Sequence, residues 1–379
     1  MRMSTPVQGE QQAHPGRGET GSTPRPVSTS GLGVGPRPRH LFDVRAAFLS
    51  HSSLSPATRA QLHAFAALGV EVTAIIPPSD HPRDRWKRGA LRRALQDAAP
   101  DVVHLDLEPH LPLASMALAE ARRLGFATTV VTALENESSL TWRERRRRGR
   151  NLREARGIHA ATPGAATLAG PVGNAPLLMA PRTGVVAPSG MAPLDQDGLT
   201  MAFSGRLVPA RGLDQLLRAA VDIAGSWQLL VAGGGPAQPE LETLAERLGI
   251  SGRISWLGSL PADERAEIWG RADCAVVPAR RTNTPVDQAS TGALQAMAAG
   301  RPVVATRTGA LPEFIGDSGI LVDDDDLEAL TAALQRLRDD PELRQSLGAA
   351  ARRRVLERYS THAVAQRLLD LWRQIVGCV

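Results

Sequence analysis

Residues 201–212 read MAFSGRLVPARG, a short apolar strand that runs into a turn, and a segment with helical periodicity follows from Leu213 to Ala224. The same order of strand, turn and helix recurs along the chain from Val44 onward. Such alternation is typical of parallel sheets wrapped by helices, so it predicts an α/β fold of Rossmann-like, doubly wound domains. The expected strands are 44–49, 70–76, 102–105, 127–131, 158–161, 201–203, 228–232, 254–257, 274–277, 302–305 and 319–322.

The length of 379 residues suits two domains. The first forty residues are rich in Gly, Pro, Ser, Thr and Gln, so residues 1–40 are predicted to be a disordered tail. The Pro- and Gly-rich stretch 170–198 is the expected linker. The predicted division is therefore an amino-terminal domain over 41–185, a carboxyl-terminal domain over 186–360 and a final helix over 361–379.

The chain carries a net charge of +5, and almost all of its basic residues are arginines. The densest arginine run, residues 143–150, is expected on a helix, where a solvated face is favoured over a surface for anionic lipid or nucleic acid. An aromatic content of 3% argues further against nucleic acid. No apolar run reaches the roughly 20 residues that a membrane-spanning helix needs. Cys274 lies in an expected strand and is predicted to be a buried thiol. These features fit a cytoplasmic protein, with peripheral contact at the inner face of a membrane left open.

Two arginines in the opening stretch are candidates for binding phosphate. Arg206 and Arg211 lie in a strand-to-helix turn, where guanidinium groups and free helix amides together suit a diphosphate. Two solvated loop arginines are the competing interpretation.

A second candidate site lies in residues 284–305, TPVDQASTGALQAMAAGRPVVA. Ser290 or Thr291 is placed to cap a helix, and Gly292 lets a phosphate approach the backbone. Asp287 precedes the expected helix, and Gln295 lies about one turn inside it. A capped helix leading into a buried strand, with no ligand, explains the same pattern.

Six sequence blocks together resemble the donor-binding domain of the retaining family 4 glycosyltransferases. The resemblance extends from about residue 201 to 359 and implies the two-domain GT-B fold and a nucleotide diphosphate sugar as donor. It assigns donor contacts to Gly205, Arg206, Arg211, Leu257, Asp287, Ser290, Thr291, Gly292 and Gln295. The blocks are GRLVPARG (205–212), VAGGGP (231–236), ISWLG (254–258), ADCAVVP (272–278), QAMAAGRPVVA (295–305) and GALPE (309–313).

The chain departs from this family at its E-x7-E motif, where Asp287 and Gln295 replace the two glutamates. The amino-terminal half is similar to the acceptor domain of bacterial members through PDVVHL (100–105) and TVVTALEN (129–136). Glu135 then becomes a candidate for orienting or deprotonating the acceptor, and helix capping is its equally weighted alternative. His104 and Asn136 are the further candidates for acceptor contact, with a structural histidine as the commoner role for His104.

The resemblance implies front-face transfer, in which Arg206, Arg211, Asp287 and Glu135 serve the reaction. No Asp-x-Asp motif stands at a matching position, so we expect transfer without a metal or other cofactor. The expected partners are the donor and an acceptor that is a glycan, a lipid-linked sugar or a small natural product, in cell-surface glycan or secondary-metabolite assembly. A degenerate relative that binds nucleotide sugar or a protein partner without turnover is the main alternative, and a GT-B epimerase or phosphorylase is a third.

Overall fold

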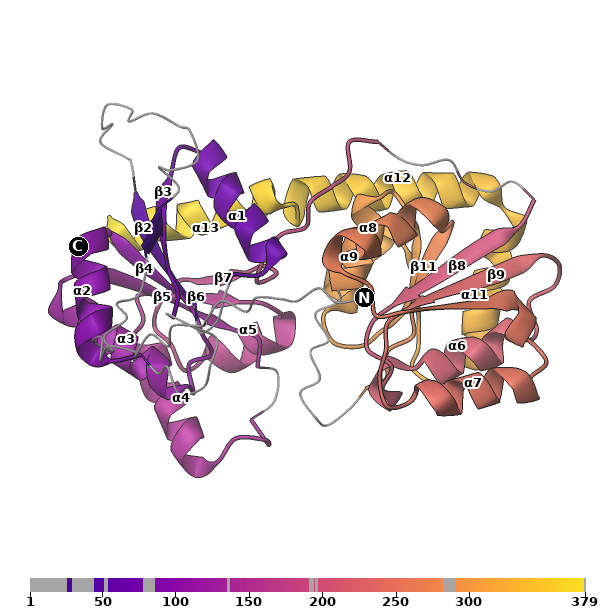
Figure 1. The fold of residues 1–379 in the computed structure, drawn as a ribbon, viewed down its shortest axis with the longest axis horizontal. Helices are drawn as coiled ribbons and strands as arrows, with labels where there is room; N and C mark the ends of the chain where they lie inside the picture. The colour runs from indigo at the N-terminus through magenta and orange to yellow at the C-terminus, as the bar shows by residue number, and fades with distance from the viewer. Residues whose placement is uncertain are drawn as a thin grey trace, which may run out of the picture.

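In the computed structural model the chain forms two α/β domains that lie side by side (Figure 1). The described residues are 26–28, 44–50, 54–77, 86–134, 137–190, 194, 197–281 and 291–377. Helices cover both faces of each sheet, and for this reason the central strands are buried along most of their length. The predicted α/β class with two doubly wound domains is confirmed.

The amino-terminal sheet has the strand order β1-β3-β2-β4-β5-β6-β7, and all pairs from β2 to β7 are parallel. β3 lies on one side of β2, and β4 to β7 follow in chain order on its other side. The strands are β1 (Pro26–Ser28), β2 (Arg45–Ser50), β3 (Glu71–Ile75), β4 (Val102–Asp106), β5 (Ala127–Thr132), β6 (Gly157–Ala160) and β7 (Leu177–Met179). The helices are α1 (Pro56–Ala67), α2 (Arg88–Ala98), α3 (Pro112–Arg123), α4 (Trp142–Glu154) and α5 (Pro163–Ala169).

Two short strands lie where the sequence predicts none. β1 falls inside the predicted tail and pairs antiparallel with β3 at the edge of the sheet; the other residues of the tail lie outside the described residues. β7 falls inside the expected linker and pairs with β6. Strands of three residues are too short to show a periodicity, so the connection between the sheets begins later than the composition indicates.

The carboxyl-terminal sheet is wholly parallel, with the order β10-β9-β8-β11-β12-β13. Its core includes the buried thiol of Cys274, and burial raises the pKa of that thiol. The strands are β8 (Leu199–Ser204), β9 (Trp227–Ala232), β10 (Ile254–Gly258), β11 (Cys274–Val277), β12 (Val303–Thr306) and β13 (Ile320–Val322). The helices are α6 (Leu213–Ala220), α7 (Gln238–Arg247), α8 (Ala262–Arg271), α9 (Thr291–Ala298), α10 (Leu311–Ile315) and α11 (Leu327–Asp339), with short 3-10 helices at Pro209–Arg211, Ser251–Arg253 and Gly316–Ser318.

The last two helices join the domains. α12 (Pro341–Arg358) packs along the carboxyl-terminal domain, and the chain then crosses back so that α13 (Thr361–Val376) packs on the amino-terminal sheet (Figure 1). Trp372 of α13 is fully buried and stacks on Phe65 of α1, with ring centroids 4.7 Å apart. The final helix is therefore part of the amino-terminal core. Among the described residues, no helix has both the length and the apolar character needed to cross a bilayer.

Candidate active site

The carboxyl edge of the second sheet has the geometry of a ligand site. β9 and β10 lie on one side of β8, and β11, β12 and β13 lie on the other. The chain therefore leaves β8 and β11 in opposite directions, and ligands of open α/β sheets bind at this reversal, outside the carboxyl ends of the strands.

The loop after β8 is held by a glycine-rich turn after β9. The Gly205 amide donates to the Ala232 carbonyl at 3.0 Å, and the Leu207 amide donates to the Gly234 carbonyl at 3.0 Å. A Cβ atom at Gly235 would lie 2.3 Å from the Leu207 carbonyl oxygen, so only glycine permits this approach. These contacts fix the backbone from which the Arg206 side chain leaves.

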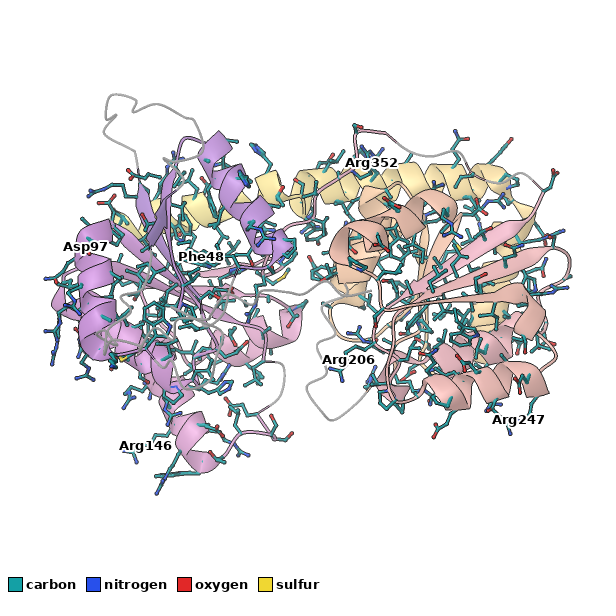
Figure 2. All side chains as sticks on the ribbon, viewed as in Figure 1. Phe48, Asp97, Arg146, Arg206, Arg247 and Arg352 are labelled. Carbon is teal, nitrogen blue, oxygen red and sulfur yellow. The ribbon has the colours of Figure 1, made fainter. Side chains whose placement is uncertain are left out.

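Both predicted phosphate-binding arginines lie in this loop. Arg206 is exposed on the side of its domain that faces the amino-terminal domain (Figure 2). Arg211 is half-buried and ends the short 3-10 helix Pro209–Arg211. Gly212 follows with φ +67°, and its backbone lies directly against the Pro278 carbonyl at the end of β11. The arginine loop therefore spans the point where the strand order reverses.

The start of α9 meets the same loop. α9 begins at Thr291, as the sequence predicts, and a Cβ atom at Gly292 would lie 3.2 Å from the Ser204 carbonyl oxygen at the end of β8. The first amides of a helix have no partner within the helix and carry a partial positive charge. Gln295 is half-buried one turn further along. The structure thus places two predicted anion-binding features, the arginine loop and the helix start, next to each other.

The structure describes some of the remaining predicted donor contacts and not others. Leu257, in β10, is half-buried, and the next residue, Gly258, accepts a 2.7 Å hydrogen bond from the Gly233 amide. Leu257 therefore lies beside the glycine-rich turn. Asp287 and Ser290, together with Glu135 and Asn136 of the acceptor side, lie outside the described residues.

His104 lies in the predicted strand, but its side chain is not exposed at the acceptor edge. It is within β4, 1% exposed, and it stacks on Phe48 with ring centroids 5.1 Å apart. The edge of Trp372 and the ring of His159 close the other sides of the imidazole, and burial lowers its pKa. An imidazole enclosed in the core has no route to an acceptor, so the predicted acceptor contact is wrong and the structural alternative is the one observed.

A set of anchoring contacts at the donor edge was missed by the sequence prediction. Arg280, just after β11, donates to Asp214 of α6 at 2.7 Å and pairs with Asp325 at 3.2 Å. The Arg281 amide donates to Asp324 at 2.7 Å, and Asp324 accepts from Gln215. The acidic run after β13, residues 323–326, thus holds the backbone and side chains of the two arginines that follow β11. The run's position after a strand end was the available signal.

The amino-terminal sheet carries a polar cluster at its own carboxyl edge. Glu108 accepts from the Thr132 hydroxyl at 3.1 Å and from the Ala133 amide at 2.7 Å. Arg182, which follows β7, pairs with Glu108 and with Asp106, each at 3.3 Å. The cluster ties the loops after β4 and β5 to the interdomain connection.

Residues 192–354 match the family described as Glycosyl transferases group 1. The matched segment lies in the carboxyl-terminal domain, which is similar to that family. The match covers the arginine loop, the glycine-rich turn and α9, so it contains the whole predicted donor site.

Curated relatives match the same half of the chain. A GDP-mannose-dependent alpha-(1-6)-phosphatidylinositol monomannoside mannosyltransferase of Mycolicibacterium smegmatis is 33% identical over 173 residues, which cover 44% of this chain and 45% of the relative. A D-inositol 3-phosphate glycosyltransferase of Thermomonospora curvata is 35% identical over 193 residues, covering 47% and 43% of the two chains. The chain thus spans less than half the length of these relatives.

Solved structures resemble most of the chain, including both domains. Sucrose-phosphate synthase from Thermosynechococcus elongatus aligns with a TM-score of 0.68 and 19% identity, over 89% of this chain and 100% of that chain. Anabaena HepE in complex with UDP aligns with a TM-score of 0.65 and 16% identity, over 86% and 98%. The carboxyl-terminal domain is therefore one half of a two-domain GT-B fold.

Proposed function

We propose that the protein is a hexosyltransferase that moves a sugar from a nucleotide diphosphate to an acceptor hydroxyl with retention of configuration, as a family 4 enzyme. The start of α9 beside the arginine loop, at the strand reversal of the carboxyl-terminal domain, carries the proposal. This arrangement offers helix amides and guanidinium groups to one diphosphate.

The chemistry follows from the charge that develops on the leaving group. As the bond from the anomeric carbon to the diphosphate breaks, negative charge grows on the diphosphate oxygen, and Arg206, Arg211 and the amides of Thr291 and Gly292 stabilise it. The acceptor oxygen forms its bond to the anomeric carbon on the same face. Its proton passes to the departing diphosphate oxygen, so the step needs positioning more than a separate base.

The other site residues take supporting roles. Asp287 and Gln295 contact the sugar and the ribose, while Gly205, Ser290 and Leu257 complete the donor pocket. Glu135 and Asn136 orient the acceptor. A glycan, a lipid-linked sugar or a small natural product supplies the hydroxyl, in cell-surface glycan or secondary-metabolite assembly on the cytoplasmic side.

The donor classes to test are set by the relatives. The M. smegmatis relative is GDP-mannose-dependent, and HepE has been solved with UDP-glucose. We expect the purified protein to release nucleotide diphosphate from one sugar of these two classes, and we expect Arg206→Ala to lower kcat/KM by about a hundredfold or more. Arg247→Ala, an exposed arginine on α7, serves as the matched control (Figure 2).

Two results would decide against the proposal. Nucleotide binding without turnover of any donor, with acceptor extracts present, would assign the chain to the degenerate alternative, which the replacements at Asp287 and Gln295 favour. A product with inverted anomeric configuration, measured by proton NMR, would contradict retention.

A further inference from the structure

The first residue of α4 is an exposed tryptophan, directly before the arginine run. Trp142 is 69% exposed, the largest value among the large apolar side chains that the structure describes. Its position is nevertheless well defined, because Thr141 caps the helix and exchanges hydrogen bonds with Glu144 in a capping box. An apolar ring is therefore held in solvent at an ordered helix start.

The arginines of α4 divide into an inward and an outward set. Arg148 is fully buried and pairs with Glu137 at 2.5 Å, and Arg147 donates to the His110 carbonyl at 2.8 Å. The outward set is exposed, and within the described part of the chain none of its members forms an ion pair with a carboxylate. The outward set is Arg143, Arg145, Arg146 and Arg153, whereas Arg150 donates to the Ser115 hydroxyl of α3 at 3.2 Å.

The tryptophan and the outward set form one surface. The Arg146 guanidinium carbon lies 5.5 Å from the centre of the Trp142 ring, and Figure 2 shows Arg146 at the free end of α4, directed away from the domain. On its other side α4 packs on α3, where the Asn151 amide donates to Ser115 at 2.8 Å. The outward surface of α4 is thus separate from the contacts that hold the helix in place.

We propose that this surface, Trp142 with the outward arginines of α4, docks the protein on an anionic phospholipid membrane. A tryptophan ring favours the boundary between headgroups and acyl chains, and arginines beside it attract acidic headgroups. Single-stranded nucleic acid would need several free aromatic faces for stacking, whereas Trp142 is the only aromatic residue of α4 and one face of its ring is covered by Arg146. The membrane is therefore the better match.

The docking surface lies next to the acceptor edge of the amino-terminal domain. α4 follows the carboxyl end of β5, and Arg147 ties it to the loop after β4. Docking through Trp142 would hold that edge close to the bilayer, which suits a lipid-linked acceptor; this consequence rests on the proposed transferase function, whereas docking itself does not.

The test is co-sedimentation of the full chain with vesicles of phosphatidylcholine alone and of phosphatidylcholine with about a third phosphatidylglycerol. We expect binding to the anionic vesicles only, and we expect Arg143→Glu combined with Arg146→Glu to weaken it by roughly tenfold or more. Trp142→Ala should weaken binding and Trp142→Phe should retain most of it. Arg247→Glu, on the far domain, should bind as the wild type does.

Each other outcome overturns the proposal. The first is an absence of vesicle binding, and the second is vesicle binding that the α4 substitutions leave unchanged. The third is that the protein binds single-stranded RNA but not vesicles, and that the same substitutions abolish RNA binding. An unchanged circular dichroism spectrum shows that the variants fold. Nucleotide binding is measured in parallel, so that failure of the docking surface is distinguished from failure of the donor site.

Discussion

Gly212 sets the shape of the arginine loop. Its φ of +67° lies in the left-handed region, and an added Cβ atom would lie 1.7 Å from the Pro278 carbonyl oxygen. We expect Gly212→Ala to lower the free energy of unfolding by about 3 kcal/mol and to weaken nucleotide binding, because the loop must move away from β11. Urea denaturation and calorimetric titration measure the two effects.

Gly249 provides the control for this substitution. It has a similar φ of +70°, but nothing lies within 4 Å of its Cβ position. Gly249→Ala should cost only the backbone strain, about 1 kcal/mol, and should leave nucleotide affinity unchanged. Equal effects of the two substitutions would show that the close approach to Pro278 has no importance.

His159 makes the stability of the protein depend on pH. It is fully buried, its Nε2 donates to the Ala180 carbonyl at 3.0 Å, and burial lowers its pKa to about 4. The unfolded chain binds a proton near pH 6.5 that the folded chain does not, so stability falls as the pH drops from about 6.5 to about 4. The contribution of His159 to this loss is about 3 kcal/mol, and the neighbouring buried His104 acts in the same direction.

Urea denaturation at several pH values between 7 and 4 measures this dependence. His159→Gln should flatten the curve, while substitution of the exposed His63 to Gln should not. A His159 variant with an unchanged slope would contradict the assignment of the pH dependence to this buried imidazole.

Single residues also show where the sequence succeeds and where it fails. Arg206 and Thr291 lie where predicted, because a strand end and a helix start can be recognised from local pattern. His104 could not be placed, because the side of a buried strand on which a polar residue lies depends on packing from α13, far away in sequence.

At the scale of elements, the turn after β13 holds the turn after β11. Arg280 connects the two through its pairs with Asp214 and Asp325, and its amide donates to the Ala210 carbonyl at 2.9 Å inside the arginine loop. We expect Arg280→Ala to raise the Kd for nucleotide diphosphate by about fivefold, since these pairs are partly exposed and together contribute about 1 kcal/mol. Titration calorimetry measures the change.

Arg373→Ala is the comparison, because it removes a partly exposed pair with Asp370 on α13. It should leave the Kd unchanged. A normal Kd in Arg280→Ala would contradict the role of the acidic turn in positioning the donor site.

Elements with repeated burial patterns could be predicted well. α9 begins where the sequence predicts a capped helix, and each long parallel strand lies within a few residues of its expected position. β1 and β7 were not expected, because three paired residues owe their structure to a neighbouring strand and not to their own composition.

At the scale of the whole molecule, two segments cross between the domains and are joined to each other. The Val185 amide donates to the Tyr359 carbonyl at 2.9 Å, and the Thr361 amide donates to the Val185 carbonyl at 3.1 Å. The buried Gln61 side chain of α1 contacts both crossings, because its amide group donates to Thr361 and its oxygen accepts from the Gly184 amide, each at 2.8 Å.

We expect Gln61→Ala to lower the free energy of unfolding by about 2 kcal/mol, because it leaves buried backbone groups of both crossings without their partner. Gln366→Ala, which removes an exposed contact with Asp370 on α13, should cost far less. Denaturant unfolding of the two variants measures the difference, and equal costs would contradict a role for Gln61 in joining the crossings.

The most direct measurement is calorimetric titration of the wild type, Arg206→Ala, Arg211→Ala and Arg247→Ala with GDP and with UDP. If the arginine loop and the start of α9 form the donor site, one nucleotide binds the wild type and Arg247→Ala alike, and each loop variant binds at least about tenfold more weakly. Equal affinity in all four proteins, or no binding of either nucleotide to the folded wild type, would contradict the donor site.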